Sequence, residues 1–197
     1  MWRLINFLSF FIASTAMAGS QAYESLSVST RTVLQRTVSD RAVPMFVTLS
    51  DLEARNWLDS MMKRLEKRIS EIEERKAFLM TVHYEATRAG LDPELVLSII
   101  QVESNFRKYA VSSAGARGYM QVMPFWVDLI GSQEHNLFHL RVNLRYGCTI
   151  LRHYLDLEKG DYFRALGRYN GSLGKADYPN LVFNAWHRHW TYSTVSQ

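Results

Sequence analysis

Apolar residues recur every three or four positions through most of this chain, and this spacing constrains the fold more than any other feature. Trp57, Met61, Leu65 and Ile69 fall four apart, and the other face carries Lys63, Arg64, Glu66, Lys67 and Arg68. Such periodicity predicts amphipathic helices. Strand signals are weak, apart from residues 118–122. We therefore expect a mainly α fold with at most a minimal β element.

Capping residues place the ends of these helices. Residues 70–73 have the pattern of a capping box that restarts a helix, and Gly90 is a plausible stop for it. Asp92 is a good N-cap and Pro93 suits the first helical position, so a helix should run from there to about Ser104. Later helices are expected over 141–158, from 161 toward 169, and from 179 to 190.

The first eighteen residues have the order of an export signal. Arg3 precedes an apolar run over 4–13, and small residues follow, ending in Ala16-Met17-Ala18. This order is typical of a cleavable signal peptide, although a buried N-terminal helix is the alternative. We expect a mature protein that begins near Gly19, without a Cys there to carry a lipid, and that is soluble in the periplasm.

The remaining chain divides by pattern into four parts. Residues 19–50 are rich in Ser, Thr and Val, and we interpret them as a linker or a loose extension, with a pair of short strands possible. A helical segment over 51–77, a catalytic domain over 78–190 and a tail over 191–197 follow. The charges of 51–77 fit a solvated helix face, and a coiled-coil surface is the alternative.

Composition limits the partners and the cross-links. The 197 residues are 47% hydrophobic, which is enough for one sizeable core, and Cys148 alone cannot form an intrachain disulfide. The formal charge of +4 becomes +3 without Arg3, which suits an acidic polymer, a nucleic acid or an anionic membrane. Export argues against nucleic acid.

Glu103 is the candidate for chemistry on the helix that begins at Pro93. It lies four residues after Ile99 and seven after Val96, so it shares the apolar stripe of that helix. Loss of water raises the pKa of a carboxyl group, and a raised pKa lets a general acid hold its proton near neutral pH. The alternative is a side chain that turns outward at a frayed helix end.

Three motifs around Glu103 resemble the lytic transglycosylase catalytic domain, a family with a lysozyme-like fold. The first is Glu103-Ser104, and the second is the stretch 110–124, in which Gly118, Gln121 and Met123-Pro124 match the family pattern. The third is Tyr169-Asn170-Gly171, and Asn143 matches a further recurrent Asn. The resemblance covers about 78–190.

The resemblance implies cleavage of peptidoglycan glycan strands, with Glu103 as the single acid/base. It implies that Tyr169 donates a hydrogen bond that orients Glu103. Met123 would form an apolar wall, although it could be plain core, and Asn170-Gly171 could be only a turn. The residues implied to bind substrate are Ser112, Gln121, Met123, Tyr169 and Asn170.

The sequence departs from the family at a few positions. Arg168 stands where Ala is usual, and Phe125-Trp126 follows Pro124 where a small polar residue is common. These bulky residues could narrow the groove or stack on sugar. No second acid accompanies Glu103 in a motif, and the next acids downstream, Asp128 and Glu134, fall in an expected surface loop.

The family chemistry needs only one acid. Glu103 would protonate the glycosidic oxygen and then take a proton from the C6 hydroxyl of N-acetylmuramic acid, which gives a 1,6-anhydro sugar. A lysozyme-type hydrolase and a peptidoglycan-binding accessory protein are the rival interpretations. We expect no metal and no cofactor, because the pairs His135/His139 and His187/His189 lack a zinc-site pattern. Protein partners, and endo against exo cleavage, stay open.

Overall fold

The computed structural model describes residues 21–39 and 52–192, and within these ranges the chain is built from helices. This confirms the mainly α fold. Around residues 111–122 the described chain has two isolated β-bridges, Val111 with Arg117 and Arg117 with Val122, in place of a strand. The helices are α1 (Val28–Ser39), α2 (Leu52–Leu65), α3 (Ile72–Arg88), α4 (Pro93–Ser104), α5 (Phe125–Ile130), α6 (Leu140–Leu157), α7 (Tyr162–Asn170), α8 (Asp177–Ala185) and a terminal π-helix (Trp186–Trp190).

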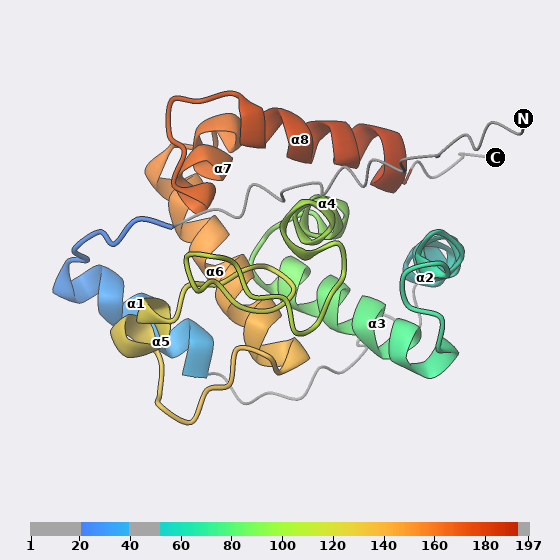
Figure 1. Cartoon of the computed structure of the whole chain (residues 1–197), viewed down its shortest axis with the longest axis horizontal. Helices are drawn as coiled ribbons and strands as arrows, with labels where there is room; N and C mark the ends of the chain where they lie inside the picture. The colour runs from blue at the N-terminus through green and yellow to red at the C-terminus, as the bar shows by residue number, and fades with distance from the viewer. Residues whose placement is uncertain (1–20, 40–51, 193–197) are drawn as a thin grey trace, which may run out of the picture.

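Helix α4 lies at the centre of the molecule, with α3, α8 and the π-helix packed around it (Figure 1). Its residues 95–100 are all buried, so it has no wet face over nearly two turns. The Asp92 carboxylate accepts hydrogen bonds from the backbone N–H groups of Glu94 and Leu95, which fixes the start of the helix as expected. Asn105 ends it in the left-handed conformation, directly after Ser104.

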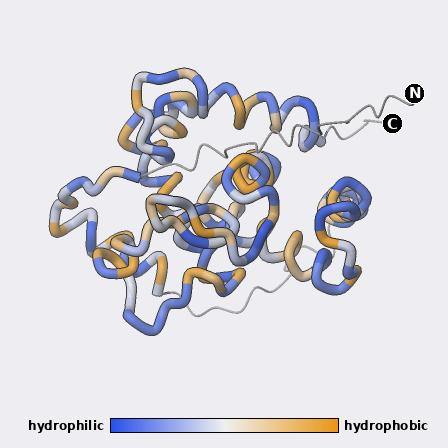
Figure 2. The backbone as a smooth tube through the Cα atoms, in the orientation of Figure 1, coloured by the Kyte–Doolittle hydropathy of each residue, from blue (hydrophilic) through white to orange (hydrophobic). Residues whose placement is uncertain are grey.

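The outer helices are amphipathic, and the tube in Figure 2 changes repeatedly between hydrophilic and hydrophobic along them. The long helix α6 packs on α1, α3 and α7. Its Gly147 lets the Met120 side chain approach the helix backbone closely, because a Cβ at that glycine would lie 2.3 Å from the Met120 sulfur. The loop between α4 and α5 is thereby pressed onto α6.

The expected linker over 19–50 is wrong for residues 28–39, which form helix α1. Ser27 caps this helix, because its hydroxyl accepts a hydrogen bond from the Thr30 N–H at 3.1 Å. Leu34 and Val38 lie four apart and are buried. The strand preference of Val and Thr is overridden here, because packing on α5 and α6 stabilises a helix that buries apolar residues four apart. The expected signal peptide lies outside the described residues.

Two smaller expectations also need correction. Helix α3 does restart after residue 70, but its N-cap is Glu71, and no side chain caps it, so there is no capping box. Instead Arg75 donates to the backbone carbonyls of Ile69 and Ser70. Asp128 is on helix α5 rather than in a loop.

A buried carboxylate joins α3 to α6. Glu85 is fully buried and forms ion pairs with Arg145 at 2.9 Å, Arg88 at 3.0 Å and Arg141 at 3.4 Å. Arg145 is itself only 8% exposed, so its charge depends on Glu85 for compensation. Removing one partner of such a pair leaves an uncompensated charge in a medium that solvates it poorly.

We predict that Glu85→Gln lowers the free energy of unfolding by about 3–5 kcal/mol, because the guanidinium groups then lose their buried counter-charge. Asp156→Asn is the matched control, since it breaks an exposed ion pair with Arg152 and should cost less than about 1 kcal/mol. Urea unfolding of the three proteins measures both values. Equal effects of the two variants would contradict a stabilising role of the buried cluster.

Candidate active site

Glu103 lies in the last turn of α4, and its side chain is turned inward rather than to solvent. The residue is 5% exposed. Its Oε1 atom accepts a hydrogen bond from the Tyr178 hydroxyl at 2.7 Å. Its Oε2 atom is buried and has no hydrogen-bond partner. The two oxygens of one carboxyl group therefore have different surroundings.

Burial raises the pKa of Glu103 to about 8, and the hydrogen bond from Tyr178 counteracts part of that rise. The carboxyl group is therefore mostly protonated at neutral pH. Because Oε1 already accepts the Tyr178 hydrogen, the acidic proton belongs on Oε2. Burial also raises the pKa of Tyr178 well above its usual range, with the Glu103 charge as a smaller cause, so this hydroxyl stays a donor.

Tyr178 was not singled out from the sequence, although it makes the one direct hydrogen bond to Glu103 in the described chain. It lies 75 residues away, in the first turn of α8. Pro179 follows it and suits the beginning of a helix. Helix α8 packs on α4, and this packing brings Tyr178 to Glu103. No local motif marks the residue, so only the helix packing reveals it.

The expected bond between Tyr169 and Glu103 is wrong. The Tyr169 hydroxyl donates instead to the carbonyl oxygen of Met120 at 2.7 Å. Tyr169 is fully buried on α7 and is still near enough for the Glu103 charge to contribute to the rise of its pKa, after burial itself. The loop carbonyl is the acceptor within its reach, so Tyr169 positions the loop rather than the acid.

The predicted binding residues of the loop also shape the loop itself. Gln121 is buried with a positive φ of 50°, and its Nε2 donates to the carbonyl oxygens of Ala110 and Gly118 at 3.1 and 2.9 Å. Ser112 is half-buried, and its hydroxyl oxygen accepts from the Ala116 N–H at 3.0 Å. The Gln121 carbonyl oxygen and the Ser112 hydroxyl hydrogen take no part in these bonds.

Asn143 ties this loop to α6. Its Oδ1 accepts from the Met120 N–H at 2.8 Å, and its Nδ2 donates to the carbonyls of Arg117 and Leu137. Gly118 is required beside it, because φ is +76° there and a Cβ would lie 2.4 Å from the Asn143 Nδ2 atom. The recurrent Asn and Gly of the motif are thus explained by one close contact.

Two further predicted residues are in different surroundings. Met123 is half-buried against the core, and its N–H donates to the Gln21 side-chain oxygen at 3.2 Å. Asn170 is buried at the end of α7, and its Nδ2 has no hydrogen-bond partner. A buried amide without a partner is costly. Gly171 follows it in the left-handed conformation.

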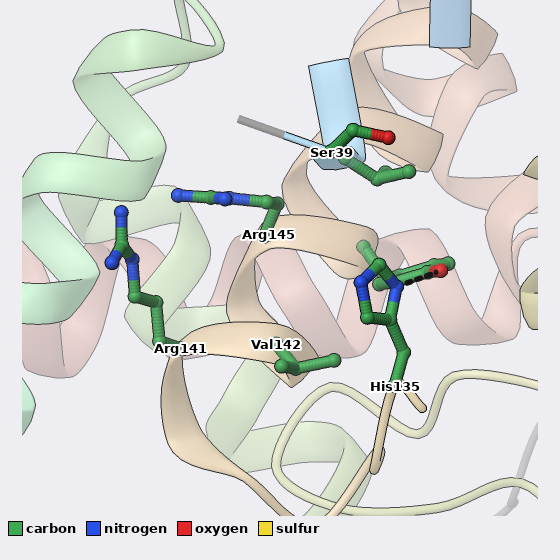
Figure 3. A pocket seen from close by; sticks show the side chains of 7 residues that line it. Ser39, His135, Arg141, Val142 and Arg145 are labelled. Carbon is green, nitrogen blue, oxygen red and sulfur yellow. Dashed lines mark hydrogen bonds between the residues drawn. The ribbon is translucent and has the colours of Figure 1, made fainter. Parts of the chain in front are cut away.

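His135 lies in a separate pocket between α1 and α6 (Figure 3). It is outside any helix, and its Nδ1 is 2.7 Å from the Tyr146 hydroxyl, while the Arg141 and Arg145 side chains extend away from it.

The described residues contain no group of three or more His, Cys, Asp or Glu side chains arranged for a metal. Cys148 is buried, and burial raises the pKa of its thiol well above the usual range. Among the described helices, none is both long and apolar enough to cross a bilayer.

Comparison with known proteins identifies the family. The family model named Transglycosylase SLT domain matches residues 80–180, which is about half of the chain and includes all three motifs and Tyr178. The chain belongs to this family. Its expected relationship to lytic transglycosylases is thereby confirmed.

Named relatives agree with that family. A protein named transglycosylase from Enterobacteria phage PRD1 is 33% identical over 98 residues, which are 50% of this chain and 36% of that protein. Membrane-bound lytic murein transglycosylase C of Actinobacillus pleuropneumoniae serotype 5b is 49% identical over 49 residues, 25% of this chain and 13% of that protein. The chain thus spans little more than a third, or less, of the length of these relatives.

A solved structure is also similar. It is an inactive mutant of the lytic transglycosylase Slt from Pseudomonas aeruginosa, with 20% sequence identity and a TM-score of 0.45. The match covers 86% of this chain and 35% of that one.

We predict that Glu103→Gln becomes more stabilising, relative to wild type, as pH rises. Below pH 4.5 the carboxyl group is protonated in both folded and unfolded chains, so ionisation costs nothing there. Between 4.5 and about 8 only the unfolded chain ionises, so wild type loses stability with each pH unit. The difference in unfolding free energy should therefore grow by roughly 4 kcal/mol between pH 4 and pH 8.

Urea unfolding at several pH values measures this difference. Glu134→Gln is the control for the substitution itself, because Glu134 is exposed and outside the site. A difference between Glu103→Gln and wild type that does not change with pH would show that Glu103 ionises equally well in both states.

Proposed function

We propose that this protein is a peptidoglycan lytic transglycosylase that uses Glu103 as its only acid/base. One observation carries the proposal. Glu103 is a buried carboxyl group, protonated at neutral pH, with one oxygen held by Tyr178 and the other without a partner. A proton on that free oxygen is what a glycosidic oxygen needs when its bond to carbon breaks. The family membership supports the same substrate class.

The proposed reaction has two proton transfers through one residue. Glu103 donates its proton to the glycosidic oxygen between N-acetylmuramic acid and N-acetylglucosamine, and the C1–O bond breaks. The C6 hydroxyl of the muramic acid then attacks C1, and its proton returns to the Glu103 carboxylate. The product is a 1,6-anhydro end, no water is consumed, and the enzyme is regenerated.

The surroundings of Glu103 favour this route over a two-carboxylate hydrolysis. Ordinary glycosidases place a second carboxylate about 5–10 Å from the acid. No other carboxylate contributes to the raised pKa of Glu103, and Asp128 and Glu134, the acids next along the chain, are exposed in the described structure. An internal hydroxyl of the substrate therefore replaces the missing partner.

Substrate binding is proposed along the loop that Asn143 holds. Ser112 would donate its hydroxyl hydrogen and Gln121 would accept at its free carbonyl oxygen. Asn170 would donate from its unpartnered Nδ2 atom, and Met123 would form an apolar wall. Tyr169, whose hydroxyl is used by Met120, would support this surface from behind.

The sequence also supports a location for the protein, and the site distinguishes the proposed function from its two rivals. The order of residues 1–18 supports export to the periplasm, where peptidoglycan lies. A lysozyme-type hydrolase would release a reducing end rather than an anhydro end. An accessory protein that only binds glycan needs neither a raised pKa at Glu103 nor the hydrogen bond from Tyr178.

We predict that Glu103→Gln lowers the rate of muropeptide release by more than about 10²–10⁴-fold. The amide has no proton to give, and one residue serves both proton transfers. Wild type should release anhydro products from purified sacculi. Mass spectrometry distinguishes them from hydrolysed products, which are heavier by one water. Hydrolysed products would identify a lysozyme-type enzyme, and an active Glu103→Gln would remove Glu103 from the chemistry.

We predict that Tyr178→Phe lowers turnover about ten- to hundredfold, because a hydrogen bond to a charged group is worth about 1.5–3 kcal/mol. That bond lowers the pKa of Glu103, so its loss should also move the alkaline limb of the pH profile to higher pH. Tyr169→Phe is the matched control, since it removes the hydroxyl of an equally buried Tyr that bonds to Met120.

Tyr169→Phe should keep its alkaline limb and most of its turnover at equal folded concentration. The measurement is initial rate on sacculi between pH 5 and pH 10 for all three proteins. If Tyr169→Phe moved the limb and Tyr178→Phe did not, the assignment of the two tyrosines would be reversed.

A further inference from the structure

The two positions where the groove departs from its family contact one segment of the chain. Phe125 and Arg168 are far apart in sequence, yet both contact the residues that precede helix α1. We name residues 21–26 the strap. Figure 1 shows this segment, in blue, running from the beginning of α1 toward α6 and α7.

Three contacts hold the strap against the proposed substrate surface. Glu24 pairs with Arg168, with 2.9 Å between the carboxylate oxygen and the guanidinium nitrogen. The Tyr23 and Phe125 rings pack edge to face, with ring centroids 5.7 Å apart. Gln21 accepts the hydrogen bond from the Met123 N–H.

Gln21 is the most deeply buried residue of the strap. It is only 5% exposed, and its amide lies near the Tyr169 hydroxyl, where it counteracts part of the rise in the pKa of Tyr169. The Glu103 charge also contributes to the raised pKa of Tyr169. Because Gln21 also accepts the Met123 N–H, the end of the strap lies within the surface that the proposed function assigns to glycan.

The strap uses a donor that a peptidoglycan sugar can also use. The Met123 N–H is bonded to the side-chain carbonyl of Gln21, and the acetamido groups of both peptidoglycan sugars carry the same kind of acceptor. A sugar that accepts this hydrogen bond must first remove Gln21 from it. The two ligands of Met123 exclude one another.

The strap is bound in a way that permits its release. Tyr23 is 65% exposed, and Arg168 is shared between Glu24 and Glu158. The Nε2 atom of Gln21 is buried without a hydrogen-bond partner, which opposes its insertion. Such contacts are weak enough for an incoming ligand to replace.

Helix α1 does not need the strap for its own attachment. Its Leu34 and Val38 are buried, and its Arg31 donates to the Leu129 carbonyl of α5 at 2.7 Å. The strap can therefore leave the groove while α1 stays in place.

We propose that the strap is an intramolecular competitor of peptidoglycan: residues 21–26 occupy part of the groove, and substrate binds by displacing them. This proposal rests on the proposed function of the groove. It gives Arg168 and Phe125 the role of holding the strap. The free enzyme is thereby restrained until a glycan strand is present at sufficient concentration.

Binding to sacculi tests the proposal without any catalysis. In a Glu103→Gln background, the triple variant Gln21→Ala, Tyr23→Ala, Glu24→Gln is compared with the unaltered strap by co-sedimentation with purified sacculi. If the strap is closed for about 70–90% of the time, loosening it lowers the apparent Kd about three- to tenfold. Glu24→Gln alone should give a smaller change in the same direction, and it serves if the triple variant folds poorly.

The matched control is Arg31→Ala, which loosens α1 but leaves every strap contact intact. It should not change the apparent Kd. An unchanged or raised Kd for the triple variant, or an equal fall for Arg31→Ala, would overturn the proposal.

The active protein gives a second readout. With Glu103 present, the triple variant should show a KM for sacculi lowered by the same factor and an unchanged kcat. If wild type released no muropeptides at all, the proposed function would fail, whereas the binding measurement would still decide whether the strap competes for sacculi.

Discussion

The hydrogen bond from Tyr178 to Glu103 joins α8 to α4, two helices far apart in the sequence. The candidate active site depends on this bond. It fixes one carboxyl oxygen as an acceptor and thereby directs the acidic proton to the other. Burial of the last turn of α4 raises the pKa, and the phenol limits that rise. An acid without Tyr178 would be harder to ionise and free to rotate, so its donation of a proton would be slower.

Much of α4 and its acid could be predicted from residues close together in the chain. Asp92 and Pro93 mark the beginning of the helix, and the spacing from Ile99 places Glu103 on the buried stripe. These signals are local because capping and periodicity act over a few residues. The structure turns the side chain inward, as the apolar stripe indicates.

The tyrosine assignment failed for the opposite reason. Tyr169 stands in a recognisable motif, whereas Tyr178 has no motif and reaches Glu103 only through the packing of α8 on α4. Helix α1 was missed similarly, because the β-preference of Val and Thr outweighed two apolar residues four apart in a short segment. In both cases the deciding contact joins residues far apart in sequence, which single-chain patterns do not report.

The close packing of the loop on α6 has a mechanical consequence. Gly118 and Gly147 allow contacts so tight that a single methyl group would collide, and Asn143 bonds the loop backbone at Arg117 and Met120. This loop, which forms one side of the proposed cleft, is therefore stiff, because closely packed backbone cannot shift without steric clashes. In the strap, by contrast, Tyr23 is 65% exposed and the Glu24 side chain is 40% exposed. The strap can therefore move to admit a glycan strand, while the loop that Asn143 holds stays fixed beside the bond to be cleaved.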